Sequence, residues 1–429
     1  MPARPRFERL DDWLDWQQQL HPATIELGLR RISNVLARTG WARPRAPVIT
    51  VGGTNGKGSC VALLDAVLRA QGYRVATFTS PHLLDYRERI RIGGEMVSEA
   101  SLIAAFERAA DALGPDSLTF FEFNTLAALL IFETAGPDVV LLEVGLGGRL
   151  DSVNVVDPDV AVVVSIGLDH MDWLGPDEEA IGREKAGIFR AGRPAVFGMP
   201  DPPQSVRERA REIGAPLEVR GTDFDGRAVG AAGWDFTVGG RVELAALPLP
   251  SLPGPIQVAN AATALMALHQ LRNRLPLSRA AIVRGLQSAR LPGRFQRVPD
   301  ARGFEWLLDV AHNPAAAATL AANLRALPVT GRTLAVCGML GDKDVPGVIG
   351  VLRGSIDQWF ASAPEGPRAI DADELSRRAG AAGVHLQPAG TVTEAMLRAA
   401  GVARAGDRIV VFGSFHTVGP ALAALRIPL

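Results

Sequence analysis

The chain has 429 residues, of which 47% are hydrophobic and 21% charged, so it can form two or three globular domains. A net charge of −1 argues against a general polyanion binder, because nucleic-acid affinity depends on clustered positive charge. No run of apolar residues approaches the length of about 18 that a membrane-spanning helix needs. The first residues lack the apolar segment of a signal peptide, and two cysteines suit a reducing compartment. We therefore expect a soluble cytoplasmic protein with no nucleic-acid or membrane partner.

Lysine is rare in this chain. Among 45 Lys and Arg residues, the only lysines are Lys57, Lys185 and Lys343. Most exposed cations can be arginine at little cost, so a persisting lysine indicates a position that needs a compact charge or a nucleophilic amine. The three lysines are therefore candidate functional residues.

The N-terminal part of the chain predicts alternating helices and strands. Apolar spacing around residues 25–36 favours a helix within the first forty residues. A strand at 47–51, a glycine-rich loop, a helix at 59–71 and a strand at 73–79 form a βαβ unit. Helices at 122–134 and 177–189 alternate with strands at 138–144, 159–166 and 194–197. These strands are apolar on both faces, as in a buried parallel sheet.

The pattern changes after residue 215. Short alternating segments at 215–250 favour a small antiparallel sheet, and helices follow at 256–271 and 277–288. Residues 291–296 look like a linker. A new α/β alternation then begins, with strands at 304–310, 333–337, 358–360 and 408–412 and a helix ending near residue 327. We expect an α/β fold: a P-loop ATPase-type domain with a mostly parallel sheet over residues 1–290, and a smaller Rossmann-like α/β domain over residues 297–429.

A glycine-rich loop between a predicted strand and helix carries the strongest functional signal. Glycines let backbone N–H groups converge on phosphate oxygens, the helix N-terminus adds partial positive charge, and Lys57 can reach the terminal phosphates. Gly58 follows the lysine, where the strict P-loop pattern has Ser or Thr. The alternative is an ordinary glycine-rich turn. The predicted nucleotide contacts are Gly53, Thr54, Asn55, Gly56, Lys57, Gly58 and Ser59.

Five further motifs follow this loop in order. They are Thr79-Ser-Pro-His-Leu, Glu143-Val-Gly-Leu-Gly-Gly-Arg-Leu-Asp, Leu168-Asp-His-Met-Asp-Trp-Leu-Gly, Arg183-Glu-Lys-Ala-Gly-Ile and Asp309-Val-Ala-His-Asn-Pro. Together with the glycine loop they resemble the Mur ligase superfamily, which couples ATP cleavage to amide formation, and within it the folylpolyglutamate and dihydrofolate synthases. The resemblance covers about residues 25 to 420, essentially the whole chain.

The resemblance implies a site for ATP and two Mg²⁺ ions, with Ser80, Glu143 and His170 as metal ligands. Glu143 also suits this role by position, because it ends a predicted strand and hard cations prefer oxygen ligands. Glu143 could instead be a capping or salt-bridged acid. His170 is less expected, since imidazole more often binds transition metals, and a hydrogen-bonded structural histidine is the alternative.

The resemblance also implies that Lys185 is carbamylated, which would turn a cation into an anionic oxygen ligand near the metal. Arginine cannot supply the neutral amine that this reaction needs. The alternative for Lys185 is a helix charge pair with an acid. The remaining ATP contacts implied by the resemblance are Asn260, Arg294 and Asp309, with Arg294 reaching the phosphates on domain closure. His312 is expected near the γ-phosphate or the incoming amino acid, as a catalytic residue with Lys57 and Lys185.

Three segments look like the pterin-contacting segments of this family. They contain Ile25, Glu26 and Leu27, then Phe121, Glu122 and Phe123, then Leu150, Asp151 and Ser152. Aromatic rings can stack on a flat heterocycle, although one of the two phenylalanines at alternate positions is expected in the core. Lys343 and Ser414 are candidates to hold glutamate carboxylates. Lys343 could instead be a charge at a helix start.

These features together predict a monomeric ATP-dependent ligase. The carboxylate of dihydropteroate or a folate is phosphorylated by ATP, and the amine of L-glutamate then attacks the acyl phosphate. One alternative is a peptidoglycan-type Mur ligase acting on a nucleotide-sugar peptide, although the short N-terminal region leaves little room for a uridine-nucleotide domain. A P-loop switch without ligase chemistry is a second alternative, but it would not need a second domain carrying Asp309 and His312.

Overall fold

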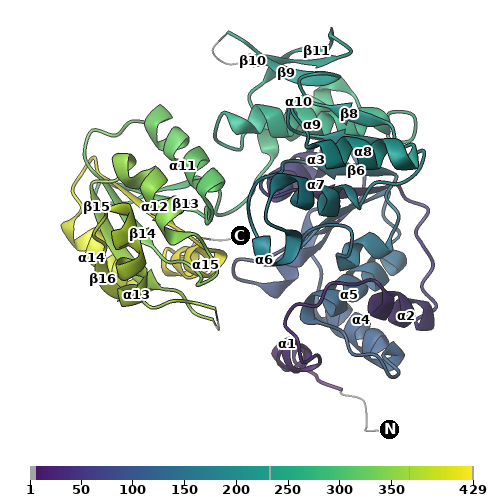
Figure 1. Ribbon diagram of the computed structural model, residues 1–429, viewed down its shortest axis with the longest axis horizontal. Coiled ribbons are helices and arrows are strands. Elements are labelled where there is room, and N and C mark those ends of the chain that lie inside the picture. Colours follow the sequence, from purple (N-terminus) through teal and green to yellow (C-terminus); the bar gives the residue numbers. More distant parts are fainter. Residues whose placement is uncertain (1–5, 231–232, 367, 428–429) are drawn as a thin grey trace. The chain divides into compact units, whose positions relative to one another are not determined.

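The computed structural model describes residues 6–230, 233–366 and 368–427, which divide into two compact units (Figure 1). The first unit contains the described residues up to Pro81 together with Arg87–Ser251 and Val258–Ala289. The second contains the described residues from Arg290 onward and two short earlier segments, His82–Tyr86 and Leu252–Gln257. The chain therefore enters the second unit twice before its main portion begins.

An eight-stranded sheet forms the centre of the first unit, in the order β4-β3-β2-β5-β1-β6-β7-β8. The strands are β1 (Val48–Gly52), β2 (Val75–Phe78), β3 (Ile90–Ile92), β4 (Glu95–Met96), β5 (Val139–Glu143), β6 (Val160–Val163), β7 (Ala195–Phe197) and β8 (Leu217–Val219). Only β3 and β4 at one edge pair antiparallel, so the expected mostly parallel sheet is confirmed. Strand β1 lies between β5 and β6, which brings the carboxyl ends of all three to one edge of the sheet.

Helices cover both faces of this sheet. Helix α3 lies in the crossover from β1 to β2, and α5 lies in the crossover from β4 to β5. In the order of the sheet, the first crossover runs toward the β4 edge and the second runs away from it. Because such crossovers are right-handed, α3 and α5 lie on opposite faces. The helices of this part are α1 (Leu10–Gln19), α2 (Arg30–Arg38), α3 (Lys57–Gln71), α4 (Glu99–Ala112), α5 (Phe120–Ala135), α6 (Met171–Leu174), α7 (Glu178–Ala186), α8 (Gln204–Ile213), α9 (Ile256–Gln270) and α10 (Arg279–Ser288), with 3₁₀ turns η1 (Tyr86–Arg89) and η2 (Ser152–Val155).

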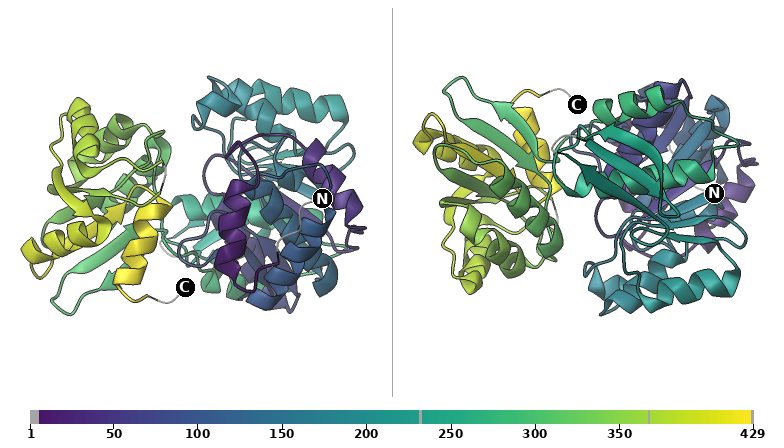
Figure 2. Two further views of the ribbon diagram at one scale, coloured as in Figure 1. Left: turned by 90° about the horizontal axis from the view of Figure 1, so that it is seen from below. Right: turned by 90° about the horizontal axis from the view of Figure 1, so that it is seen from above.

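A separate antiparallel sheet confirms the change of pattern after residue 215. Its strands are β9 (Phe224–Val229), β10 (Gly233–Val238) and β11 (Arg241–Pro248), in the order β11-β10-β9. The right-hand panel of Figure 2 shows this sheet in teal. Residues 217–219 differ from the expectation, because they form β8 and pair parallel with β7 in the main sheet.

The predicted helix around residues 25–36 is only partly correct. Residues 20–29 contain no helix or strand, and α2 begins at Arg30. The apolar residues Ile25, Leu27 and Leu29 alternate rather than follow helical spacing, and Gly28 disfavours a helix. The backbone N–H of Gly28 instead donates to the carbonyl oxygen of Leu150 at 3.1 Å, so a distant contact stabilises the loop.

The second unit is a smaller α/β domain, as expected. Its six-stranded sheet has the order β12-β13-β17-β14-β15-β16, and only the edge strand β12 pairs antiparallel. The strands are β12 (Gln296–Pro299), β13 (Glu305–Asp309), β14 (Thr333–Cys337), β15 (Gln358–Ala363), β16 (Gln387–Thr391) and β17 (Arg408–Phe412). Apolar clusters with α11 (Pro314–Ala326), α12 (Val345–Leu352) and α13 (Ala372–Ala379) cover one face, and α14 (Val392–Val402) and α15 (Phe415–Ala424) cover the other. The 3₁₀ turns are η3 (Arg353–Ser355) and η4 (Gly380–Ala382).

Within the described residues, no helix combines the length and the apolar character needed to cross a bilayer.

Candidate active site

The glycine loop joins β1 to α3, and its carbonyl oxygens bind the ammonium of Lys57. Gly53 and Gly56 have φ values of 145° and 84°, a region that side chains disfavour. The Lys57 ammonium donates to the carbonyl oxygens of Gly53 at 2.9 Å and Thr54 at 3.3 Å. Lys57 is also the first residue of α3, so its charge lies at the positive end of the helix dipole. Gly58 and Ser59 follow in the first turn. This arrangement concentrates positive potential where a phosphate can bind.

The loop is fastened to the segment that follows β6. Thr54 N–H donates to the carbonyl oxygen of Ser165 at 2.8 Å, and Asn55 N–H donates to the Ser165 hydroxyl at 2.9 Å. The Thr54 hydroxyl donates to the Gly167 carbonyl at 3.1 Å and accepts from Gly167 N–H at 3.1 Å. Sequence reasoning missed Ser165, although its place after the strand beside β1 could have indicated it.

Asn260 lies against the loop from α9. A Cβ atom on Gly56 would be 3.1 Å from the Asn260 amide oxygen and 2.9 Å from Val164 Cγ1. Asn260 is itself 5% exposed. Gly56 is therefore required both by its backbone conformation and by the close approach of these side chains.

Ser80 and Glu143 come together at the same edge of the sheet. The carboxylate of Glu143 accepts a hydrogen bond from the backbone N–H of Ser80 at 3.2 Å. Glu143 ends β5, directly beside Val51 of β1, and is 5% exposed. A buried carboxylate and a hydroxyl beside a phosphate loop are oxygen donors of the kind that Mg²⁺ prefers.

His170 lies in the segment that continues from Ser165 and Gly167. It adopts a left-handed conformation, φ 52°, before α6, and its backbone N–H donates to Asp169 at 2.9 Å. Its Nε2 atom is 3.9 Å from Asp169 Oδ1. Among the described residues, no three His, Cys, Asp or Glu side chains form a metal cage. A metal held by Ser80, Glu143 and His170 would therefore need water and phosphate oxygens as further ligands, which is usual for Mg²⁺.

Lys185 is a buried titratable group of the first unit. It lies in the last turn of α7 and is 4% exposed. Burial lowers the pKa of Lys185 to about 7; the positive charge of Lys57 lowers it further, and Asp169 and Asp151 oppose the shift. A substantial fraction of this amine is therefore neutral at neutral pH.

Asp151 closes the turn that follows the second glycine-rich motif. Its carboxylate accepts from the backbone N–H groups of Leu146 at 2.8 Å and Val153 at 3.0 Å. Burial raises the pKa of Asp151 to about 6, and these backbone donors and Lys57 oppose the shift. The neighbouring Ser152 hydroxyl is 2.6 Å from the Thr125 hydroxyl.

The three segments expected to contact a heterocycle lie close together. The loop carrying Ile25 and Leu27 is joined to Leu150 through the Gly28 hydrogen bond described above. The ring of Phe121 covers Gly145, where a Cβ atom would be 2.5 Å from its Cζ, and it stacks on Phe78 with centroids 5.7 Å apart. Phe123 is fully buried between the rings of Trp16 and Phe106. Of the two phenylalanines, Phe121 is therefore the one that remains available for stacking.

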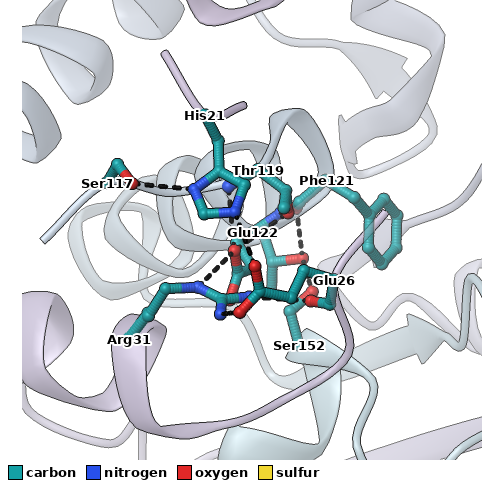
Figure 3. A network of polar contacts seen from close by, with 9 residues as sticks. His21, Glu26, Arg31, Ser117, Thr119, Phe121, Glu122 and Ser152 are labelled. Carbon is teal, nitrogen blue, oxygen red and sulfur yellow. Dashed lines mark hydrogen bonds and ion pairs between the residues drawn. The ribbon is translucent and has the colours of Figure 1, made fainter. Parts of the chain in front are cut away.

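Glu26 and Glu122 are joined by a residue that sequence reasoning missed. Figure 3 shows Arg31 between the two carboxylates, with His21 contacting Glu26 from the other side. The hydrogen bond of His21 to Glu26 and the nearby Arg31 hold the pKa of Glu26 below its usual range. Neither His21 nor Arg31 belongs to a recognisable motif, so only the fold reveals them.

In the second unit, Asp309 organises the segment around Arg294. Its carboxylate accepts from the backbone N–H groups of Phe295 and Ala311, both within 2.9 Å. Burial raises the pKa of Asp309, and the nearby Arg294 guanidinium opposes that shift. The Arg294 guanidinium carbon lies 5.5 Å from the centroid of the Phe415 ring. His312 follows, with Nδ1 2.9 Å from the carbonyl oxygen of Val310.

The two candidate glutamate contacts lie at helix starts of the second unit. The side chain of Lys343 is 8% exposed, and its amine is 3.7 Å from Asp342. The Ser414 hydroxyl caps α15 by accepting from the backbone N–H of His416 at 3.0 Å. Both groups are therefore held in place by local contacts.

Comparison with known proteins decides the family. The Mur ligase middle domain matches residues 51–268, and the Mur ligase glutamate ligase domain matches residues 293–415. The dihydrofolate synthase/folylpolyglutamate synthase of Escherichia coli is 46% identical over 97% of this chain and 95% of its own length. The chain belongs to this family of Mur ligases.

Solved structures of the family have the same fold. FolC of Escherichia coli, in complex with DHPP and ADP, is 45% identical with a TM-score of 0.92, and the match covers 99% of each chain. A bifunctional folylpolyglutamate synthase/dihydrofolate synthase with Mn, AMPPNP and L-glutamate bound is also 45% identical, with a TM-score of 0.90 over 99% of this chain and 100% of its own. This chain is an ATP-dependent ligase of the family, as the resemblance implied, and a nucleotide switch without ligase chemistry is excluded.

Proposed function

We propose that this chain joins L-glutamate to dihydropteroate and to tetrahydrofolate and its polyglutamates, with ATP as the energy source. The main support is that the glycine loop, Ser80 and Glu143 lie together at one edge of the sheet. The chain is also 46% identical to a dihydrofolate synthase/folylpolyglutamate synthase. Relatives solved with DHPP and with L-glutamate support the choice of substrates. A nucleotide-sugar peptide is not favoured as acceptor.

The proposed reaction has two steps. A carboxylate oxygen of the acceptor attacks the γ-phosphorus of ATP, the bond to the β-phosphate oxygen breaks, and ADP leaves. The glutamate amine then attacks the acyl carbon, the carbon–oxygen bond to phosphate breaks, and the amine loses a proton. Activation is needed because a free carboxylate is a poor electrophile. The protein's contribution is positioning and charge stabilisation.

We assign the phosphates to the glycine loop, with Lys57 stabilising charge on the transferred phosphoryl group. Asn260 is proposed as a further ATP contact, supported by its place against Gly56. In the second unit, Arg294 and Asp309 are proposed as ATP contacts and His312 as a residue near the reacting groups. Lys343 and Ser414 are proposed to hold the carboxylates of glutamate. All these residues come from one chain, so we propose that a monomer is sufficient.

Ser80, Glu143 and His170 are proposed to hold Mg²⁺, with two ions expected in all. Mg²⁺, when bound, would supply positive charge to the phosphate oxygens. The oxygen donors of Ser80 and Glu143 fit a hard cation, and His170 would complete the set from the segment fastened to the loop.

Lys185 is proposed to carry a carbamate. The neutral amine attacks carbon dioxide, a nitrogen–carbon bond forms as one carbon–oxygen π bond breaks and leaves its electron pair on oxygen, and the nitrogen loses a proton. The lowered pKa and the burial of Lys185 favour the neutral amine that this reaction requires. Labelling with ¹³C-bicarbonate above pH 8 should give a carbamate NMR signal that Lys185→Met lacks; an identical spectrum in the variant would refute the modification.

The proposed activity is tested by measuring ADP formation with glutamate and one of three acceptors: dihydropteroate, tetrahydrofolate or a nucleotide-sugar peptide. We expect turnover with the two pterin acceptors and none without glutamate. Turnover with the nucleotide-sugar peptide alone would overturn the proposal.

A further inference from the structure

Arg31 occupies an unfavourable position for a cation. Helix α2 begins with Arg30 and Arg31 and has no acidic residue in its first turn, so both charges oppose the helix dipole. The side chain of Arg31 is also only 15% exposed. A largely buried guanidinium at a helix N-terminus needs specific partners to be stable.

Those partners come from two different segments. Arg31 forms an ion pair with the carboxylate of Glu26, and its Nη2 donates to the Glu26 carbonyl oxygen at 2.7 Å. Its Nη2 is also 3.1 Å from Glu122 Oε1 (Figure 3). His21 contacts Glu26 at 2.9 Å and the Ser117 hydroxyl at 2.7 Å. The guanidinium thus joins the irregular loop of residues 20–29 to the first turn of α5.

Glu122 is held by structural contacts, mostly through Oε2, while among the described residues Oε1 has the ion pair with Arg31 but no hydrogen bond. Besides Arg31, its Oε2 accepts from the backbone N–H of Thr119 at 2.8 Å and from the Thr119 hydroxyl at 2.9 Å. The carboxylate is 4% exposed. Glu122 therefore fixes the start of α5, where the adjacent Phe121 covers Gly145, and its burial leaves little surface for direct contact with a ligand.

These contacts and those that follow form a closed ring that links the three expected acceptor segments to one another. From α5, the Thr125 hydroxyl donates to the Phe121 carbonyl oxygen at 2.9 Å and is 2.6 Å from the Ser152 hydroxyl. The Gly28 N–H to Leu150 hydrogen bond returns from that segment to the loop. Arg31 is the only arginine or lysine in this ring, and it makes the sole ion-pair connection between the loop and α5 among the described residues.

We propose that Arg31 is a positioning residue for the acceptor: it holds the loop of residues 20–29 against α5, and Glu26 and Glu122 act through it rather than by touching substrate. The inference deepens the proposed function and rests on it, because the loop and α5 carry the segments assigned to the pterin acceptor. Arg31 affects acceptor binding while the nucleotide site at the glycine loop is built from other contacts.

Arg31→Met is the test variant, and Arg38→Met is the matched control. Arg38 lies on the same helix, where it contacts Asp116 at 2.6 Å and the Ala112 carbonyl oxygen at 2.6 Å but no residue of the loop. We expect Arg31→Met to raise the KM for tetrahydrofolate about tenfold or more, the usual size for losing hydrogen bonds to a charged group. The KM for ATP should stay within about twofold of wild type.

Hydrogen exchange supplies a readout independent of turnover. Amides of residues 20–29 should exchange faster in Arg31→Met than in wild type. Their exchange rates in Arg38→Met should equal those of wild type. In the double variant Arg31→Met/Glu122→Gln, the acceptor KM should recover partly, because glutamine removes the buried carboxylate that Arg31→Met leaves unpaired. If Arg31→Met does not fold, Arg31→Lys is the second test, because lysine keeps the charge but lacks the planar guanidinium. It should raise the KM for tetrahydrofolate by a smaller factor and leave the KM for ATP unchanged.

Wild-type turnover combined with an unchanged acceptor KM in Arg31→Met and Arg31→Lys would overturn the inference alone. An equal effect of Arg38→Met, or a parallel rise in the KM for ATP, would also overturn it, since either marks general destabilisation. Absence of turnover by the wild type with both pterin acceptors would overturn the proposed function, and the inference with it.

Discussion

Lys57 shows how closely a single side chain is matched to its surroundings. Its ammonium lies within 3.3 Å of two loop carbonyl oxygens, and the adjacent Gly56 has no room for a Cβ atom. A planar guanidinium is larger and needs a different arrangement of acceptors. The composition of the chain predicted a function for its few lysines, and this geometry supports that prediction at residue 57.

Lys57→Ala is expected to lower kcat by about 10²–10³, the typical loss for removing one charge-stabilising group. Lys57→Arg should not restore activity. ADP formation at saturating substrates measures both, and circular dichroism checks that the variants fold. Near-wild-type turnover by the arginine variant would contradict the assigned phosphate role.

Lys185 should reduce the stability of the unmodified protein. Its folded pKa of about 7 is below the unfolded value of 10.5, so well below pH 7 both states are protonated and the folded state bears the full cost of burying a cation. Between pH 7 and 10.5 the unfolded state holds the extra proton, and this cost falls as pH rises. In bicarbonate-free buffer, Lys185→Met should therefore be more stable than wild type at pH 6, and its advantage should shrink toward pH 10.

Chemical unfolding of the two proteins across this pH range measures that difference. A constant difference from pH 6 to 10 would show that the Lys185 amine does not titrate within this window. The same variant should be nearly inactive if the carbamate is required, so stability and activity should change in opposite directions.

At the scale of elements, the close packing of α10 on α3 supports the phosphate loop. A Cβ atom on Gly285 of α10 would be 2.4 Å from the Cα atom of Val67 in α3, a backbone contact that cannot adjust locally. The two helix axes can approach this closely only because the residue is glycine. Helix α3 begins at Lys57, so its position affects the loop directly.

Gly285→Ala is expected to destabilise the protein by about 1–3 kcal/mol, because overpacking forces the helices apart. Gly401→Ala is the control: Gly401 lies in α14, where an added Cβ atom would have no neighbour within 4 Å. Alanine at this position should stabilise the helix by about 0.5–1 kcal/mol. Midpoints of urea unfolding compare the two variants. Equal shifts in the same direction would contradict the packing argument.

Sequence patterns predicted the elements with clear periodicity and missed those set by distant contacts. The βαβ unit around the glycine loop and the parallel strands were correct because apolar runs and glycine turns are local signals. Residues 25–29 of the loop were assigned to a helix because their alternating apolar residues merge with the true helical spacing that starts at Arg30. Its actual conformation depends on Leu150 and Glu122, about ninety residues or more away along the chain.

At the scale of the whole molecule, six ordered motifs were enough to predict the family and the two α/β units. They were also enough to propose Ser80 and Glu143 as neighbours, which their hydrogen bond supports. They could not predict Arg31 or His21, which act through ion pairs that no motif contains. They also could not predict that residues 82–86 and 252–257 belong to the second unit, since both segments lie within the sequence of the first.

The distribution of lysines has a practical consequence for covalent labelling. Lys185 is 4% exposed, the Lys343 side chain is 8% exposed, and the Lys57 amine is engaged with loop carbonyl oxygens. Exposed cations are otherwise arginines, which do not react with acylating reagents. Amine acetylation of the native protein should therefore modify few lysine side chains, and Lys57 should be the one that added ATP protects. Intact-mass spectra with and without ATP would then count occupied phosphate loops directly, without any turnover assay.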